Sequence, residues 1–126
     1  RVEAAHVAVV GLGGVGSWCV EALARSGVGA LTVVDLDDVC VSNVNRQLCA
    51  TTSSVGRFKA EVVAERCRDI SPRCEVRPVL EFVDESNVEA VLFARPPTCV
   101  VDAIDAVADK VAILEACAAR NVPVVC

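Results

Sequence analysis

Short apolar runs are the first pattern in this chain, and a turn or a polar segment follows most of them. Four runs are apolar at nearly every position, which is typical of strands buried on both faces of a parallel sheet. They lie at residues 7–10, 31–34, 98–102 and 122–126. A fifth segment, residues 75–80, alternates charged and apolar side chains and contains Pro78, so we expect it at an edge of the sheet.

Between these runs, apolar residues recur at helical spacing, and we expect four helices. They begin near Gly14 and near residues 55–56, and occupy residues 87–93 and 107–120. Ser53 or Ser54 is expected to cap the second helix. The buried faces of the first two helices are expected at Val15, Cys19, Ala22 and Leu23, and at Ala60, Val63, Cys67 and Ile70.

The alternation of strands and helices predicts the fold class. With right-handed crossovers it gives an α/β, Rossmann-like, doubly wound parallel sheet in three layers. The expected strand order is 3-2-1-4-5, which places a crevice for a ligand between the first and fourth strands.

A glycine-dense turn follows the first strand directly. Gly11, Gly13 and Gly16 fit the spacing G-x-G-x-x-G, in which the glycines permit a tight turn, close approach of a phosphate and close packing of the next helix. A helix that begins near Gly14 would direct its N–H groups toward an anion. The turn therefore predicts a bound nucleotide.

Polar residues after the second strand extend this site. Asp35 ends that strand about 20 residues after the turn, where such folds place the acid that binds a ribose hydroxyl. A polar loop without helical periodicity follows, and long loops in compact domains tend to be functional. Its candidate ligand-binding side chains are Asn43, Asn45, Arg46 and Gln47, which supply several hydrogen-bond donors. An Asx-rich turn with Arg46 paired to a nearby aspartate remains the structural alternative.

Two further charged positions suit phosphate chemistry. Lys59 lies in the first turn of a predicted helix, where a cation opposes the helix dipole unless an anion is bound in front of it. Asp102 and Asp105 follow the fourth strand, and carboxylates there can hold a hard cation such as Mg²⁺. The alternatives are a solvated surface lysine and an aspartate that caps a helix.

Composition bounds the remaining possibilities. The 126 residues suit one domain, and with 54% hydrophobic residues they can bury a substantial core. We expect a fragment that lacks an N-terminal segment and a C-terminal part, because the chain stops at Cys126 inside an apparent strand. No apolar run reaches the roughly 18 residues of a membrane span, and we expect no secretory signal. The net charge of −5 does not show the excess of basic residues that is typical of nucleic-acid-binding domains.

Eight cysteines show no C-x-x-C spacing, which argues against a zinc site or a thioredoxin-like motif. We expect mostly buried, reduced thiols in a cytoplasmic protein. If one thiol is catalytic, Cys40 and Cys49 are the candidates because they fall in the polar loop.

Three functions compete for this set of residues. An NAD-dependent oxidoreductase needs the glycine turn and the ribose acid, but no cations around the phosphates. Adenylation by ATP breaks a bond at phosphorus, so it needs Arg46, Lys59 and a metal held by Asp105 to neutralise charge as pyrophosphate departs. A nucleotide-sensing domain without chemistry is the third possibility. Adenylation uses residues that the first hypothesis leaves without a role.

The order of the motifs resembles the adenylation domain of the E1-like superfamily. That group includes ubiquitin-activating enzymes and the bacterial activators of sulfur-carrier proteins. The motifs that carry the resemblance are Gly11-Leu-Gly13-Gly14-Val-Gly16-Ser17, Asp35-x-Asp37, Asn43-x-Asn45-Arg46-Gln47, Lys59 and Asp102-Ala-Ile-Asp105. Within the group the chain is most similar to the tRNA threonylcarbamoyladenosine dehydratases, in runs such as Gly-Gly-Val-Gly-Ser-Trp and Asp-Ala-Ile-Asp.

The resemblance implies roles, with Arg46, Lys59 and Asp105 as the catalytic residues. The nucleotide-binding residues would be Gly11, Gly13, Gly14, Gly16, Asp35, Asp37, Asn43, Arg46, Gln47 and Lys59, and Asp105 would hold Mg²⁺. ATP would activate the threonylcarbamoyl carboxylate on tRNA, or else the C-terminal glycine of a ubiquitin-like sulfur-carrier protein. A homodimer and a sulfur-transfer partner protein are also implied.

Overall fold

The computed structural model describes all 126 residues, built around one parallel sheet. Its strands are β1 (His6–Val10), β2 (Ala30–Val34), β3 (Glu75–Val79), β4 (Cys99–Asp102) and β5 (Val124–Val125). A short 3₁₀ turn, Val2–Ala4, precedes β1. The strand order is β3-β2-β1-β4-β5, and the strand pairs are parallel, so the predicted topology is confirmed.

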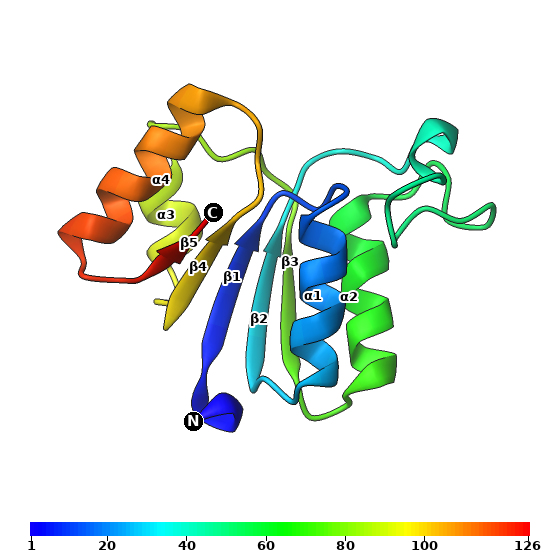
Figure 1. Cartoon of the computed structure of the whole chain (residues 1–126), viewed down its shortest axis with the longest axis horizontal. Helices are drawn as coiled ribbons and strands as arrows, with labels where there is room; N and C mark the ends of the chain where they lie inside the picture. Colours follow the sequence, from blue (N-terminus) through cyan, green and yellow to red (C-terminus); the bar gives the residue numbers. More distant parts are fainter.

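Four helices cover the two faces of the sheet (Figure 1). They are α1 (Gly16–Arg25), α2 (Lys59–Ile70), α3 (Val88–Phe93) and α4 (Val107–Ala119). α1 and α2 lie side by side over β1 to β3, and α3 and α4 cover the opposite face near β4 and β5. The longest helix, α4, has 13 residues, and no helix is long and apolar enough to cross a bilayer.

The sheet separates two hydrophobic cores. Successive residues of a strand point to opposite faces, so Val7 and Val9 of β1 join the core under α1 and α2, whereas Ala8 and Val10 join the core under α3 and α4. All five residues of both β1 and β2 are buried. This explains the continuous apolar runs of the central strands. β3 lies at the sheet edge, as its alternating pattern predicted.

The predicted buried face of α1 was wrong at Val15 and Ala22, whereas Leu23 is partly buried against the core. The glycine turn extends through residue 15, and the helix begins at Gly16 rather than near Gly14. Its buried residues are Gly16, Ser17, Val20 and Ala24. Val15 is 71% exposed, and Ala22 is exposed as well. The cause is that the turn carries Val15 away from the sheet, which changes the side of the helix that packs.

The predicted start and cap of α2 were also wrong, although its buried face is correct. The helix begins at Lys59, and Ser54 does not cap it. The Ser54 hydroxyl donates instead to the carbonyl oxygen of Cys49 and accepts from the Thr51 N–H, so it closes a turn inside the loop. A bridge between Asp38 and Phe58 then brings the chain back to the sheet just before the helix.

Candidate active site

A cleft of about 620 Å³ lies at the carboxyl ends of β1, β2 and β4. The register places these ends level with one another, because Val10 is paired with both Val34 and Asp102. The cleft brings together nearly every residue that the sequence singled out as a nucleotide or metal ligand. These are Gly11, Gly13, Gly14, Asp35, Asp37, Asn43, Arg46, Gln47, Lys59 and Asp105. Gly16 does not line the cleft.

Two glycines of the turn are required by the fold. Gly11 has φ +92°, and a Cβ atom there would lie 2.8 Å from the carbonyl oxygen of Ala103. A Cβ on Gly16 would collide with the carbonyl oxygen of Gly11, so this glycine lets α1 pack against the turn.

Gly13 differs from these two glycines. A Cβ there would make only an ordinary contact with Nε2 of Gln47, at 3.6 Å. The fold itself does not need a glycine at this position. The open space in front of Gly13 belongs to the cleft, which suits the close approach of a ligand to the backbone.

Asp35 braces the turn from the end of β2. Its two carboxylate oxygens accept from the N–H groups of Leu12 and Asp37, both at 2.8 Å. Each oxygen has a second lone pair, so the carboxylate can still accept from a ribose hydroxyl. The Asp37 side chain is exposed at the cleft.

The loop after β2 (teal in Figure 1) supplies Asn43, Arg46 and Gln47. Asn43 is buried, and its Oδ1 accepts from the N–H of Cys40 at 2.9 Å, which leaves its side-chain amide donors for other partners. The carbonyl oxygen of Asn43 accepts from the N–H groups of Arg46 and Gln47. The loop is thus an ordered turn that presents polar side chains to the glycine turn.

Arg46 folds over its own loop. Its Nη1 donates to Oδ1 of Asn45 at 2.9 Å and to the carbonyl oxygen of Ser42 at 3.2 Å. No aspartate is paired with it, which removes the alternative of an Arg–Asp turn. A guanidinium has five N–H donors, so most of them remain for a ligand in the cleft.

Lys59 is a buried residue of the cleft without an ion-pair partner. The residue is only 6% exposed, yet none of the six ion pairs of the structure includes it. Its backbone N–H donates to the carbonyl oxygen of Asp37 at 3.0 Å, which fixes the first turn of α2 beside the cleft. A buried cation without a carboxylate is costly, and an anion in the cleft would offset that cost.

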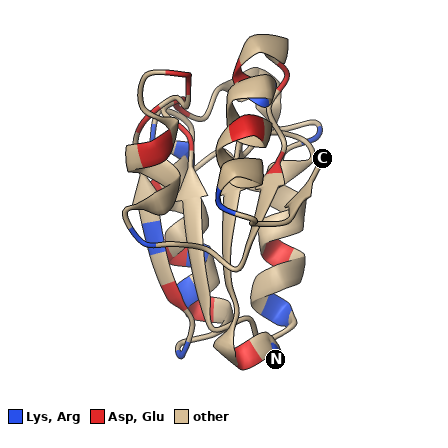
Figure 2. Ribbon diagram, turned by 90° about the vertical axis from the view of Figure 1, so that its left-hand side faces the viewer, with Lys and Arg blue, Asp and Glu red and all other residues tan.

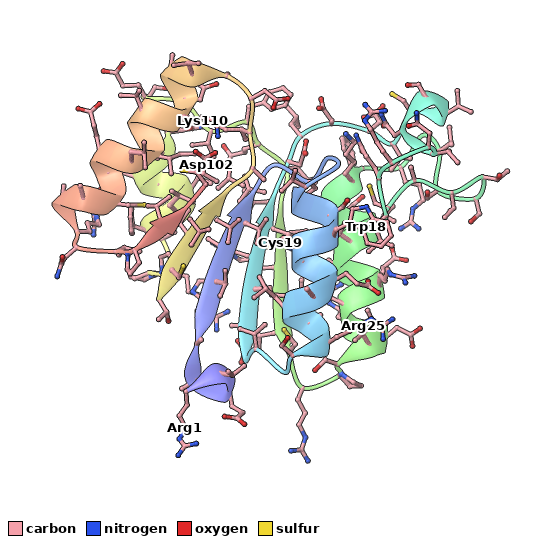
Figure 3. The ribbon with its side chains drawn as sticks, viewed as in Figure 1. Arg1, Trp18, Cys19, Arg25, Asp102 and Lys110 are labelled. Carbon is pink, nitrogen blue, oxygen red and sulfur yellow. The ribbon has the colours of Figure 1, made fainter.

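The two aspartates after β4 have different environments, and Figure 3 shows Asp102 beside Lys110. Asp102 is buried, and its carboxylate accepts from Nζ of Lys110 and from the N–H of Ile104, both at 3.2 Å. Asp105 is exposed and lines the cleft, with Asp109 one helical turn further on. The idea that Asp102 and Asp105 hold a cation together was therefore wrong, because Lys110 compensates Asp102.

Asp105 alone does not make a metal site. The structure contains no cluster of three or more His, Cys, Asp or Glu side chains that could hold a metal ion. Mg²⁺ in nucleotide sites is commonly bound by one or two carboxylates together with substrate phosphates and water. Asp105 and Asp109 fit that arrangement, in which the nucleotide supplies the remaining oxygens.

The residues that follow β3 were not predicted from the sequence. Glu81, Phe82 and Val83 line the cleft, and the Phe82 side chain is 57% exposed. The signal was available, because β3 also ends at the carboxyl edge of the sheet, where open α/β sheets bind ligands.

The cysteines do not supply a thiolate to this cleft. Cys49 is 2% exposed, and burial raises the pKa of its thiol. Burial likewise raises the pKa of Cys67 to about 11. All eight thiols are free, and Cys40 is exposed on the loop. Cys49 therefore lacks the depressed pKa of an activated nucleophile.

Comparison with known proteins agrees with this geometry. The model of the ThiF family matches residues 1–126, which is the whole chain. The chain belongs to the ThiF family. Its sheet order is that of a Rossmann-like fold.

Several relatives of this ThiF-family domain share a name. The tRNA threonylcarbamoyladenosine dehydratase of Escherichia coli K12 is 51% identical over 121 residues, which cover 96% of this chain and 45% of the relative. The enzyme of the same name from Bacillus subtilis is 44% identical over 119 residues, 94% of this chain and 46% of the relative. The E. coli molybdopterin-synthase adenylyltransferase is 34% identical over 120 residues, 95% of this chain and 47% of the relative.

A solved structure of the E. coli dehydratase in complex with ATP superimposes on this chain with a TM-score of 0.94 at 49% identity. The match covers 98% of this chain and 50% of that one. The chain thus spans about half the length of the curated relatives that it matches.

Proposed function

We propose that this ThiF-family domain binds ATP and adenylates a carboxylate, as part of a tRNA threonylcarbamoyladenosine dehydratase. The observation that carries the proposal is Lys59, a buried cation in the cleft that no carboxylate compensates. A triphosphate offers the missing negative charge. The ATP complex of the E. coli dehydratase supports the choice of nucleotide.

The reaction has two steps. A carboxylate oxygen of the threonylcarbamoyl group attacks the α-phosphorus of ATP, and the bond between that phosphorus and the bridging oxygen breaks to release pyrophosphate. The carbamoyl group of the same substrate then attacks the activated acyl carbon, loses a proton and expels AMP as the ring closes. No enzyme thiol is needed, which agrees with the buried state of Cys49.

The side chains of the cleft divide this work. The turn at Gly11 to Gly16 would cradle the phosphates, and Asp35 would bind the ribose. Asn43, Arg46 and Lys59 would hold the phosphates and stabilise the charge that develops as pyrophosphate leaves, with Gln47 supporting Arg46. Asp37 would lie at the rim of the same site.

Asp105, with Asp109 beside it, would hold Mg²⁺ at the phosphates. When bound there, the ion would neutralise phosphate charge. Chelation of Mg²⁺ should therefore weaken ATP binding in the wild type more than in an Asp105→Ala variant.

A second candidate is the adenylation of the C-terminal glycine of a ubiquitin-like sulfur-carrier protein. The 34% identity to the E. coli molybdopterin-synthase adenylyltransferase favours keeping it. Under that alternative a sulfur-transfer protein would be a further partner. An NAD-dependent oxidoreductase is disfavoured, because hydride transfer breaks no bond at phosphorus and therefore does not need the charges of Lys59 and Arg46.

The decisive experiment measures AMP release by the full-length protein with ATP and Mg²⁺. We expect release with tRNA that carries threonylcarbamoyladenosine, and none with a carrier protein that ends in Gly-Gly. The reverse result would establish the second candidate, and release with neither would overturn both. Lys59→Ala and Asp105→Ala should each lower the rate at least a hundredfold, while Arg25→Ala, which alters only an exposed ion pair with Glu21, should leave it unchanged.

We further propose a cytoplasmic homodimer. The free thiols support a reducing compartment. Basic and acidic residues are interspersed on the side of the molecule shown in Figure 2, and the net charge is −5. We therefore assign most contacts with the tRNA backbone to parts of the assembly outside residues 1–126. Sedimentation of the full-length protein tests the dimer.

A further inference from the structure

Two consecutive residues of α1, Ser17 and Trp18, connect the glycine turn to the polar loop. The Ser17 hydroxyl donates to the carbonyl oxygen of Gly13 at 2.5 Å and accepts from the N–H of Leu48 at 3.2 Å. The indole Nε1 of Trp18 donates to the carbonyl oxygen of Arg46 at 2.9 Å. These bonds hold the loop at both ends of a three-residue segment, residues 46–48.

This segment has few other attachments to the glycine turn. The Arg46 side chain is bonded only to Ser42 and Asn45 of its own loop. Cys49 adds one long sulfur contact, 3.8 Å to the carbonyl oxygen of Leu12. Cys49 and Ala50, which follow the segment, are buried in the core with residues of α1 and α2, so the bonds of Ser17 and Trp18 are what attach residues 46–48 themselves to α1.

Ser17 and Trp18 each have a feature that packing within α1 does not explain. Ser17 bonds to the loop as well as to the carbonyl oxygen four residues before it. The hydroxyl of Ser26, at the other end of α1, also donates to the carbonyl oxygen four residues before it, that of Ala22, but it bonds to nothing else. Trp18 is 53% exposed, so its large ring contributes less to the core than a buried aromatic residue would. What Ser17 and Trp18 add is their contact with residues 46–48.

We propose that Ser17 and Trp18 are positioning residues that fix Arg46 and Gln47 over the phosphate-binding turn. They act through the loop backbone and not through contact with the substrate. The inference rests on the proposed function, since it assigns Arg46 to the phosphates. If the loop is displaced by a few tenths of an ångström, the preorganised charge of Arg46 stabilises the transition state less well. The initial binding of ATP is affected less than this stabilisation.

The first test compares Trp18→Phe and Ser17→Ala with Ser26→Ala in the full-length protein. Trp18→Phe keeps the ring and removes only the N–H donor. We expect each of the first two variants to lower kcat for AMP release about tenfold, with the KM for ATP changed less than threefold. Ser26→Ala should match the wild type. Unchanged kcat in Trp18→Phe, or an equal loss in Ser26→Ala, would overturn the inference.

A double-mutant cycle separates positioning from general stability. If Trp18 acts through Arg46, Trp18→Phe should cause no further loss of kcat in an Arg46→Ala background. A merely structural role predicts the same tenfold loss in both backgrounds, together with a lower melting temperature, and would contradict the proposal.

Amide hydrogen exchange gives a readout that does not require the reaction. We expect the Leu48 amide to exchange at least tenfold faster in Ser17→Ala than in Ser26→Ala. If the wild type releases no AMP with any carboxylate, the proposed function fails, while this measurement still decides whether Ser17 holds the loop. Equal exchange rates in the two variants would refute the positioning role.

Discussion

At the scale of single residues, the glycines of the phosphate-binding turn have separable tasks. Gly11 and Gly16 are needed because backbone atoms of the fold occupy the space where their side chains would lie. Gly13 lines the cleft, and a Cβ there would make only an ordinary contact with Gln47. The G-x-G-x-x-G pattern predicts all three alike, so the sequence alone could not separate the requirement of the fold from the requirement of the ligand.

Substituting these glycines should therefore give opposite results. Gly16→Ala should destabilise the protein by at least about 2 kcal/mol, because the new methyl group collides with the Gly11 carbonyl. Gly13→Ala should change the free energy of unfolding by less than about 0.5 kcal/mol while ATP affinity falls at least tenfold. Urea denaturation and calorimetric titration with ATP measure the two quantities. Equal loss of stability in both variants would contradict the assignment.

Lys59 should show a conflict between stability and function. Lys59→Met replaces an uncompensated buried cation with an apolar side chain of similar length, so we expect the free energy of unfolding to rise by about 1 kcal/mol. The same variant should lose pyrophosphate exchange into ATP. Lys110→Met is the matched control, because its cation is paired with Asp102 and its loss should destabilise the protein. A less stable Lys59→Met protein would show that the charge is already compensated.

At the scale of elements, the apolar pattern predicted which strands and helices form, and their order. It did not predict where α1 and α2 begin. The start of α1 depends on a turn that runs to residue 15, and the start of α2 depends on the contact of Asp38 with Phe58 across the loop. Both are decided by tertiary contacts. Ser54 was predicted to cap α2 because serine is a common helix cap. In the structure its hydroxyl donates to the carbonyl oxygen of Cys49 and closes a turn in the loop, so this contact also depends on how the loop folds.

The first residue of β1 gives this element a pH dependence. His6 is buried, with Nδ1 3.2 Å from the carbonyl oxygen of Pro96 and Nε2 2.7 Å from the Thr32 hydroxyl. Burial lowers the pKa of His6, and the nearby Arg95 and Arg77 lower it further. The unfolded chain therefore takes up a proton more readily than the folded protein does. Stability should be complete above about pH 6.5 and should decrease as the pH falls below it.

Thermal unfolding between pH 7.5 and 5 measures this effect. Glu21, whose pKa is lowered by its hydrogen bond with Arg66, loses its contribution only as the pH falls below about 4.5, so it does not interfere in this range. His6→Gln, which takes up no proton, should flatten the curve. A slope that is the same in the wild type and the variant would exclude His6 as its source.

At the scale of the whole molecule, the candidate site is assembled from segments that lie far apart in the chain. They come from the ends of β1, β2 and β4, from residues 81–83 after β3, from the polar loop and from the first turn of α2. The strand order made this assembly predictable for the glycine turn, Asp35 and Asp105. Arg46 and Lys59 were predicted from the polar loop and from the first turn of a predicted helix, but their positions in the cleft depend on how the loop folds.

ATP should stabilise the assembled site as a whole. With Mg²⁺ and ATP at a hundred times the dissociation constant, the free energy of unfolding should rise by about 2.7 kcal/mol. NAD at the same concentration should leave the melting temperature unchanged, because it lacks the triphosphate that Lys59 and Arg46 are expected to bind. Thermal shift of the full-length protein tests this, and stabilisation by NAD alone would favour the oxidoreductase.

The proline in β3 has a consequence for how these molecules behave at high concentration. Glu75 directs its N–H inward to the carbonyl oxygen of Gly29, so by alternation the nitrogen of Pro78 faces the outer edge of the sheet. Proline has no N–H, and the row of donors along that edge is interrupted in its middle. A strand from another molecule therefore cannot add there in register, and the edge is protected against aggregation.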